Sequence, residues 1–458
     1  MRSLTDSFLA IFLSKIVILI TGLGLEVCLA WFLKPEGRGS YEVCLVFNAL
    51  LTLCFLNGWP VASIYFVASK LLTLSEVITL TFIYGMISSF LAIITGMLLM
   101  NLPWAFFDAA DTTSFHLALL LIPSTFFSIV FLRLLTAMHE FRWFAVISIL
   151  NGVSLLLLAL MFVGVMSLGV HGALLACILR QWLVMIAVLL FFCWKYNIKI
   201  VRPSMASLRK VFCYGLRYHV GQIANNVNVQ VGTVILAMFA TKVEVGFMAV
   251  AARIMYTGVM TIPDTIMTVL LPKASEDKMG HPQLIARCAR LTGLTCAVLI
   301  LIITVFATPV VKLMFSPSFL PVVPLIRILA VGTLVRCICK VFTSYLQGTN
   351  HPGVDSFAVA TGVIVNIVIL WLLLPVMGLP AAAIAMTFSY ITSSAIITLG
   401  FLKFSRFNPL ETFWLTRSDL MVMYNAVTRF FLHYSWKKVL PRRFADREDF
   451  RSSLINRN

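Results

Sequence analysis

Charged side chains inside long apolar segments are the residues of this chain best placed to do chemistry. Eight cations lie within such segments: Lys15, Arg133, Arg180, Arg217, Arg253, Arg327, Arg336 and Lys340. Only two carboxylates, Glu26 and Asp264, lie clearly inside, and Glu42 lies at the outer edge of one segment. A charge at membrane depth is costly and needs a partner or water. The surplus of cations therefore predicts either snorkelling towards the headgroups, as for Arg133, Arg327 and Lys340, or a cavity that accepts an anionic ligand.

Helical spacing selects among these charges. Lys15 and Glu26 are separated by about three helical turns and return to nearly the same face, and Arg253 and Asp264 have the same spacing. A polar stripe on a single apolar segment is formed by Arg217, Gly221, Asn225 and Asn228. Such amides can also join helices in lipid, but the complete stripe favours the lining of a cavity.

These patterns predict two groups of site residues. The predicted substrate-binding residues are Lys15, Arg217, Asn225, Asn228, Arg253 and Arg336. Glu26 and Asp264 are candidates for coupling transport to H⁺ or Na⁺, although each could equally be a fixed counter-ion. The ten cysteines lie in or beside apolar segments and the histidines are scattered, so we expect no metal site, disulfide framework or cofactor. His171 and His219 are expected to be packing or interfacial residues.

The composition places these residues in a membrane protein. Of the 458 residues, 60% are hydrophobic and 12% are charged, and the mean hydropathy is +0.99. Segments of about 20 apolar residues cross a bilayer, and the breaks between them predict twelve spans: 7–33, 41–68, 76–100, 114–138, 143–166, 172–194, 211–240, 245–272, 291–315, 321–347, 356–376 and 380–402. We expect the first span to be retained, because no small-residue cleavage site follows it. The connections are too short to hold a catalytic domain, so we do not expect an enzyme.

Two sequence patterns recur with nearly the same spacing. The segment that ends in Gly39 reappears at the segment that ends in Gly246, and the turn at Gly169 reappears at Gly378. We therefore predict an all-α integral membrane protein with two parallel-related six-helix lobes around a central cavity. The predicted parts are an N-terminal lobe (1–196), an amphipathic cytoplasmic linker (197–210), a C-terminal lobe (211–404) and a basic cytoplasmic tail (405–458).

The distribution of Lys and Arg predicts the orientation. The segments expected outside carry Lys34, Arg38, Lys242 and Lys312, and most of the remaining cations outside the spans lie in the alternate segments and the tail. The positive-inside rule then places both termini in the cytoplasm. The net charge of +17 is thus a topology signal, and nucleic-acid binding is not expected. The tail is expected to lie on anionic phospholipid as an amphipathic helix, or to be a solvated tail that only fixes topology.

Several segments carry a family resemblance. Residues 32–41, 57–68 and 244–251, together with Pro272-Lys273-Ala274-Ser275 and residues 365–378, resemble polysaccharide-export flippases of the MOP superfamily. The resemblance covers residues 1 to about 404. It implies that the protein moves an undecaprenyl-pyrophosphate oligosaccharide from the inner to the outer leaflet of a bacterial inner membrane by alternating access. Polymerase and other glycan-assembly proteins are the partners it suggests.

Two features of this chain depart from the family pattern. Many relatives carry a basic-x-acidic pair where this chain has Asn226-Val227-Asn228, which puts ion coupling through that helix in doubt. The chain also has twelve predicted spans rather than fourteen, which separates it from the peptidoglycan-precursor branch.

Two alternative functions stay open. An ion-coupled multidrug antiporter of the same superfamily would need an acidic, aromatic cavity, and a non-transporting partner of a glycan-assembly complex would fit the basic tail.

Overall fold

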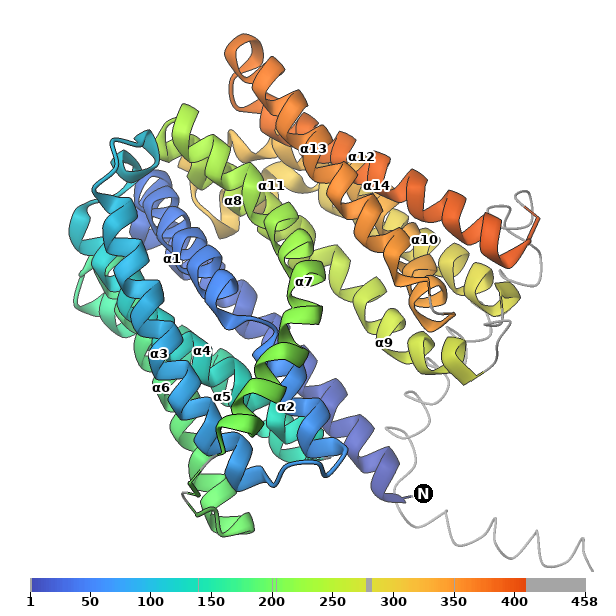
Figure 1. Ribbon diagram of the computed structural model, residues 1–458. Helices are drawn as coiled ribbons and strands as arrows, with labels where there is room; N and C mark the ends of the chain where they lie inside the picture. The colour runs from blue at the N-terminus through green and yellow to red at the C-terminus, as the bar shows by residue number, and fades with distance from the viewer. Residues whose placement is uncertain are drawn as a thin grey trace, which may run out of the picture.

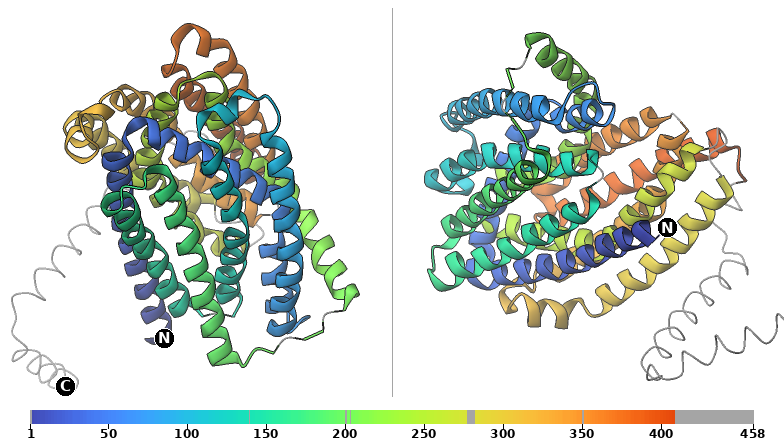
Figure 2. Two further views of the ribbon diagram at one scale, coloured as in Figure 1. Left: turned by 90° about the vertical axis from the view of Figure 1, so that its left-hand side faces the viewer. Right: turned by 90° about the horizontal axis from the view of Figure 1, so that it is seen from below.

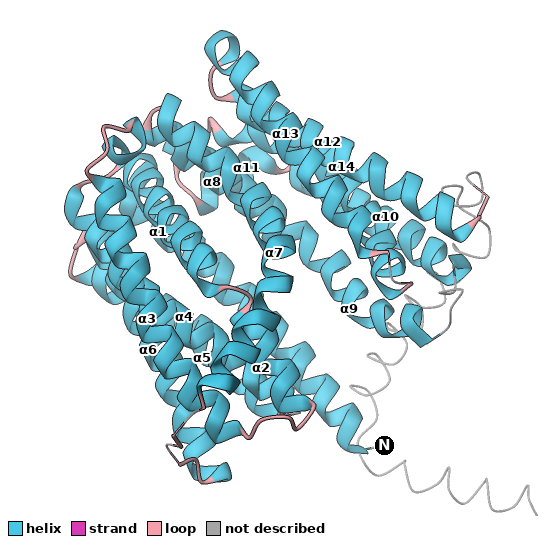
Figure 3. Ribbon diagram, viewed as in Figure 1, coloured by secondary structure: helices cyan, strands magenta, loops and turns pink. Residues whose placement is uncertain are grey.

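The fold is almost entirely helical (Figures 1 and 3). The structure is a computed structural model and describes the backbone of residues 2–138, 140–199, 201–202, 204–276, 282–349 and 351–408. Within its helices the side chains are described from residue 17 onward, except for residues 141, 217–218, 220–229, 231, 268–269, 271–276 and 352. The predicted amphipathic helix of the tail lies outside the described residues.

The first half of the chain forms one group of helices. It contains α1 (Arg2–Leu56), α2 (Trp59–Ala68), α3 (Leu74–Met100), α4 (Thr112–Ala137), α5 (Phe141–Ala159) and α6 (Gly169–Tyr196). A short 3₁₀ helix, Ala105–Ala109, precedes α4, and a π-helical turn, Leu160–Val165, continues α5. Asp111 caps α4 by accepting a hydrogen bond from the backbone N–H of Ser114, which satisfies a donor that the helix itself leaves free.

The second half of the chain forms another group of helices. It contains α7 (Met205–Phe239), α8 (Lys242–Met255), α9 (Thr261–Glu276), α10 (Pro282–Val305), α11 (Ala307–Met314), α12 (Val322–Gly348), α13 (Pro352–Met377) and α14 (Pro380–Ser405). A π-helical turn, Tyr256–Met260, joins α8 to α9, and a 3₁₀ turn, Pro317–Phe319, precedes α12.

Ten helices of the described chain are long and apolar enough to cross a membrane, which confirms the prediction of an all-α integral membrane protein. Two features explain why this number is smaller than the predicted twelve. The span Val17–Leu56 contains two arms of α1 that meet at Lys34, where φ is 57° and Pro35 follows. Helix α7 is not among the ten, because most of the side chains in its middle lie outside the described residues.

The predicted spans 41–68 and 245–272 are among those that are interrupted in the structure. The segment 41–68 is not one helix, because Asn57 and Gly58 both have positive φ and separate α1 from α2. The segment 245–272 contains the π-helical turn between α8 and α9. Neither interruption changes the hydropathy of the segment, and for that reason the apolar pattern did not reveal it.

The apolar cores indicate where the two halves of the molecule meet. One core contains residues of both halves, including Leu29, Val43 and Phe115 together with Val245 and Leu329. Two smaller cores belong mostly to one half each, the first drawn from α2 to the start of α7 and the other from α9 to α14. The halves therefore share a core at one end and have separate cores towards the other. In Figure 1 the two halves converge at the top of the view and diverge below. The view from below in Figure 2 places the two halves largely on opposite sides.

Helix α7 packs on both halves. Its first turns contact α2, where a Cβ on Gly215 would lie 2.4 Å from the carbonyl oxygen of Asn57, and Val211 belongs to the core of the first half. Its later residues contact α13 and supply Leu236 to the shared core. This helix therefore joins the two halves, and the predicted boundary at residue 211 falls within it. The division into four parts stays a prediction.

Candidate charge cluster between the lobes

A buried guanidinium organises the charges of the first half. Arg38 has a side chain only 1% exposed, and its Nη2 donates to Glu26 Oε2 over 2.9 Å. Its Nη1 lies 3.3 Å from Glu42 Oε2 without the geometry of a hydrogen bond. The kink at Lys34 brings the two arms of α1 together, so that Glu26 on the first arm meets Arg38 and Glu42 on the second. The sequence placed Arg38 in a connection between two spans, whereas in the structure it lies inside helix α1 and is buried.

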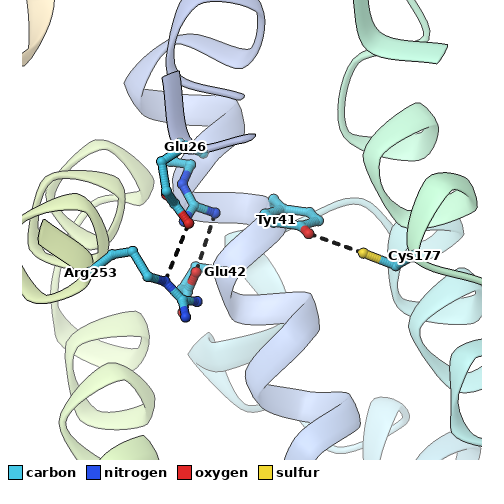
Figure 4. Close-up of polar contacts among 6 residues, drawn as sticks. Glu26, Tyr41, Glu42, Cys177 and Arg253 are labelled. Carbon is cyan, nitrogen blue, oxygen red and sulfur yellow. Dashed lines mark hydrogen bonds and ion pairs between the residues drawn. The ribbon is translucent and has the colours of Figure 1, made fainter. Parts of the chain in front are cut away.

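A second guanidinium reaches this group from the other half of the chain. Arg253 on α8 places its Nε 3.3 Å from Glu26 Oε1, and its side chain is 42% exposed (Figure 4). The cluster of Glu26, Arg38, Glu42 and Arg253, which we call the interlobe cluster, holds two cations and two carboxylates. It is electrically balanced only while α8 stays beside α1, because one of its cations comes from the opposite half.

Neighbouring contacts of Tyr41 help to hold Arg38 in the interlobe cluster. The guanidinium carbon of Arg38 lies 5.2 Å from the centroid of the Tyr41 ring. The Tyr41 hydroxyl lies 3.1 Å from Cys177 Sγ on α6, and either atom could be the donor (Figure 4). A cation over an aromatic face is stabilised by the ring quadrupole. Arg38 is therefore held by groups of its own half, whereas Arg253 has a single carboxylate partner across the interface.

The helices α1 and α8 touch through their backbones beside this cluster. A Cβ on Gly39 would lie 1.7 Å from the carbonyl oxygen of Lys242, and a Cβ on Gly246 would lie 2.2 Å from that of Pro35. These are the two glycines that the repeated sequence pattern singled out, and they face each other across the interface. A third contact is made by Trp31, whose Nε1 donates to the carbonyl oxygen of Met314 over 2.7 Å.

Asp264 has a partner that the sequence did not predict. Lys340 Nζ lies 2.8 Å from Asp264 Oδ1, and the Tyr256 hydroxyl donates to Asp264 Oδ2 over 3.4 Å. Spacing had placed Arg253 and Asp264 on one helical face, but the π-helical turn between them has more residues per turn than an α-helix and rotates Asp264 away. Lys340 therefore pairs with a carboxylate rather than only snorkelling to the membrane surface.

The remaining predicted site residues are not part of the interlobe cluster. Arg336 on α12 donates from Nη1 to Ser393 Oγ over 3.1 Å and lies 5.6 Å from the centroid of the Tyr390 ring, and no carboxylate of the described chain pairs with it. The side chains of Lys15, Arg217, Asn225 and Asn228 lie outside the described residues. The structure therefore brings together Glu26 and Arg253 among the predicted residues. The functional assignments themselves stay predictions.

Arg38, Glu42 and Lys340 were not among the predicted site residues. A sequence signal existed for the first two, because oppositely charged residues four apart on a helix are neighbours. Lys340 gave no comparable signal, since its partner Asp264 lies on a different helix.

Comparison with known proteins gives the family. The model of the family described as "Polysaccharide biosynthesis protein" matches residues 4–277, more than half of the chain. The chain belongs to this family. Its membership confirms the resemblance drawn from residues 32–41 and the related segments.

Two curated proteins are related to this chain in sequence. A probable low-salt glycan biosynthesis flippase, Agl15 of Haloferax volcanii, is 22% identical over 236 residues, which is 50% of this chain and 50% of Agl15. An uncharacterized membrane protein of Methanocaldococcus jannaschii is 27% identical over 92 residues, or 20% of this chain and 18% of that protein. The chain thus matches half or less of the length of these curated relatives.

Solved structures share the fold. An inward-facing MATE-family multidrug transporter of the MOP superfamily has a TM-score of 0.69 at 16% identity, covering 85% of this chain and 93% of its own. The lipid II flippase MurJ in an inward closed conformation has a TM-score of 0.67 at 14% identity, with coverage of 96% and 94%. The bent form of the Vibrio cholerae MATE transporter VcmN has a TM-score of 0.56 at 17% identity, with coverage of 90% and 100%. At these identities the likeness shows that the chain shares the fold of these structures.

Proposed function

We propose that this polysaccharide biosynthesis protein is a flippase. It moves an oligosaccharide linked to undecaprenyl pyrophosphate from the inner to the outer leaflet of a bacterial cytoplasmic membrane, with both termini in the cytoplasm. Family membership supports the link to glycan assembly, and the MOP-type fold supports alternating access of two lobes. A polymerase or another glycan-assembly protein would receive the product outside.

The observation that carries the proposal is the position of Arg253. Its guanidinium pairs with a carboxylate of the other lobe and is still 42% exposed. A pyrophosphate offers oxygens that a guanidinium binds through two parallel charge-assisted hydrogen bonds. An anionic headgroup between the lobes would therefore compete with Glu26 for Arg253. Arg38 is 1% exposed and already has two carboxylate partners, so it would remain paired with Glu26 and Glu42.

Ion coupling follows from the same balance of charge. When the lobes separate, the interlobe cluster loses Arg253 and keeps Glu26 and Glu42 around one guanidinium. An H⁺ or Na⁺ taken up at Glu26 would restore neutrality, which is favoured because an unpaired buried charge is costly. Asp264, which pairs with Lys340, is the second candidate, and Glu26→Gln and Asp264→Asn test the two sites separately. Normal transport by both variants with and without an ion gradient would contradict coupling at either residue.

Substitution of the cations tests the substrate proposal. Arg253→Ala and Arg217→Ala should reduce glycan export by about tenfold to a hundredfold, the effect of losing a charged hydrogen bond, while the protein still accumulates in the membrane. Arg253→Lys should recover part of the activity, because the charge returns without the bidentate fork. Arg327→Ala is the matched control, since Arg327 is exposed on α12 and no described ion pair involves it.

Two results would contradict the proposal. Full export by the Arg217→Ala/Arg253→Ala double variant at normal abundance would exclude a cationic substrate site. Restoration of export when Glu26→Gln is added to Arg253→Ala would instead indicate that Arg253 is only a structural counter-ion. Depletion of the protein distinguishes a flippase from a multidrug antiporter, because only loss of a flippase leaves a lipid-linked oligosaccharide on the inner leaflet.

A further inference from the structure

The start of α7 carries a basic surface pocket far from the interlobe cluster in sequence. A cavity of about 460 Å³ is lined by Met205, Ala206, Arg209, Lys210 and Cys213. All five residues lie on one exposed face of the first turns of the helix. The pocket therefore combines two cations with apolar side chains at the end of a membrane helix.

The two cations of this pocket are not neutralised by any carboxylate of the described chain. No described carboxylate lies within ion-pair distance of Arg209 or Lys210, and both side chains are exposed. By contrast, Lys195 nearby in the sequence pairs with Glu140. Lys199 and Arg202, which precede α7, are also exposed and add to the positive charge. A bound anion would therefore neutralise the positive charge of this surface.

The apolar part of the same face points to a lipid rather than a soluble anion. Phe212 and Leu216 are 39% and 49% exposed and continue the face beyond the two cations. Val211 and Gly215, on the opposite face, are buried against the first lobe. Arg209 lies about 10 Å from Leu216 along the helix axis, at 1.5 Å per residue. This separation allows the cations to lie among headgroups while Leu216 lies among acyl chains.

We propose that this pocket binds one anionic glycerophospholipid of the leaflet that borders the start of α7. Its phosphate would accept hydrogen bonds from Arg209 and Lys210, and one acyl chain would lie along Cys213 and Leu216. The bound lipid would hold the first turns of α7 against α2, next to the close contact of Gly58 with Gly215. The later turns of α7, which pack on α13, would remain free to move with the second lobe.

Native mass spectrometry of the full-length protein in detergent tests this site. The protein is titrated with palmitoyl-oleoyl phosphatidylglycerol and, separately, with phosphatidylcholine of the same chains. Arg209→Gln/Lys210→Gln should weaken the first phosphatidylglycerol-binding step by about 25-fold, since each cation near an anionic lipid contributes a factor of about five. Lys403→Gln/Arg406→Gln, which removes two exposed cations at the end of α14, should leave that step unchanged. Leu216→Gln should weaken the binding of both phosphatidylglycerol and phosphatidylcholine.

Three outcomes would overturn the site. Equal phosphatidylglycerol binding by the two double variants would mean that Arg209 and Lys210 act only in topology. No preference of the unsubstituted protein for phosphatidylglycerol over phosphatidylcholine would exclude an anion site. Undecaprenyl pyrophosphate that displaces phosphatidylglycerol in a manner that depends on Arg209 would assign the pocket to the transported lipid. The assay does not measure transport, so its result is independent of the proposed flippase activity.

Discussion

Arg38 is the residue on which the interlobe cluster depends most for stability. It is buried between Glu26 and Glu42, and removing it leaves these two carboxylates with one cation of the cluster, Arg253, which contacts Glu26. Breaking a buried ion pair from one side costs about 3–5 kcal/mol. We therefore expect Arg38→Gln to lower the free energy of unfolding by about that amount, measured as a large drop in the thermal midpoint in detergent.

Two comparisons make the Arg38 prediction specific. Arg133→Gln removes an exposed cation from α4 and should leave the midpoint nearly unchanged. Adding Glu42→Gln to Arg38→Gln should recover part of the loss, because it removes one of the unpaired charges. A midpoint for Arg38→Gln equal to that of Arg133→Gln would show that the cluster does not stabilise the fold.

Asp111 should give the start of α4 a pH-dependent stability. Partial burial raises the pKa of its carboxyl, but hydrogen bonds from Ser114 and His171 outweigh this and lower the pKa to about 2. His171 Nε2 lies 2.8 Å from Asp111 Oδ2 and so joins the start of α6 to the cap of α4. The folded-state pKa lies below the unfolded value of about 4. The stabilisation is therefore present above pH 4 and is lost as the pH falls towards 2.

Thermal midpoints measured between pH 5 and pH 2 test this interaction. Asp111→Asn should lower the midpoint near pH 5 and should remove the part of the acid-induced loss that comes from this carboxyl. Asp108→Asn is the control, since Asp108 is exposed in the same connection between α3 and α4 and takes part in no described hydrogen bond. Identical pH profiles for Asp111→Asn and the unsubstituted protein would contradict the assigned cause.

At the scale of elements, the contact between α1 and α8 depends on two glycines. A Cβ on Gly39 would overlap the carbonyl oxygen of Lys242 at 1.7 Å, and backbone cannot yield as a flexible side chain can. Gly39→Ala should therefore push the helices apart at this end and lower export. Gly22→Ala, in the same helix but with nothing within 4 Å of the added Cβ, should be tolerated, since alanine favours a helix by about 0.5–1 kcal/mol.

Spin labels measure this separation directly. Val165 and Val376 lie at the ends of two helices, one in each lobe, and are 82% and 81% exposed. The distance between labels at these positions should increase in Gly39→Ala and stay unchanged in Gly22→Ala. An unchanged distance in both variants would mean that the close glycine contact does not hold the lobes together.

At the scale of the whole molecule, the orientation in the membrane is the property to test first. Single cysteines in a cysteine-free background should be labelled from outside at Thr241 and Lys312 and from inside at Lys70 and Lys210. The side chains of all four residues are exposed. Ser40 is unsuitable for labelling, because it is buried and its hydroxyl donates to the carbonyl oxygen of Ala109. Labelling of position 210 from outside would reverse the proposed orientation.

The sequence by itself determined the class, the family and most of the helices of this protein. Lipid requires long apolar helices, because backbone polar groups must be satisfied within each segment, and this requirement is visible as hydropathy along the chain. The repeated patterns around Gly39 and Gly246 also predicted two related halves, and the structure places these glycines against each other. Local composition and repetition were sufficient for these conclusions.

Only the tertiary structure decided which charges meet. The sequence placed Arg38 in a connection between two spans, yet the kink at Lys34 brings it onto Glu26. Arg253 pairs with Glu26 rather than sharing a face with Asp264, since a π-helical turn changes the phase of the helix. An ion pair depends on the approach of two helices to within about 4 Å, and that approach is set by packing between segments far apart in the chain.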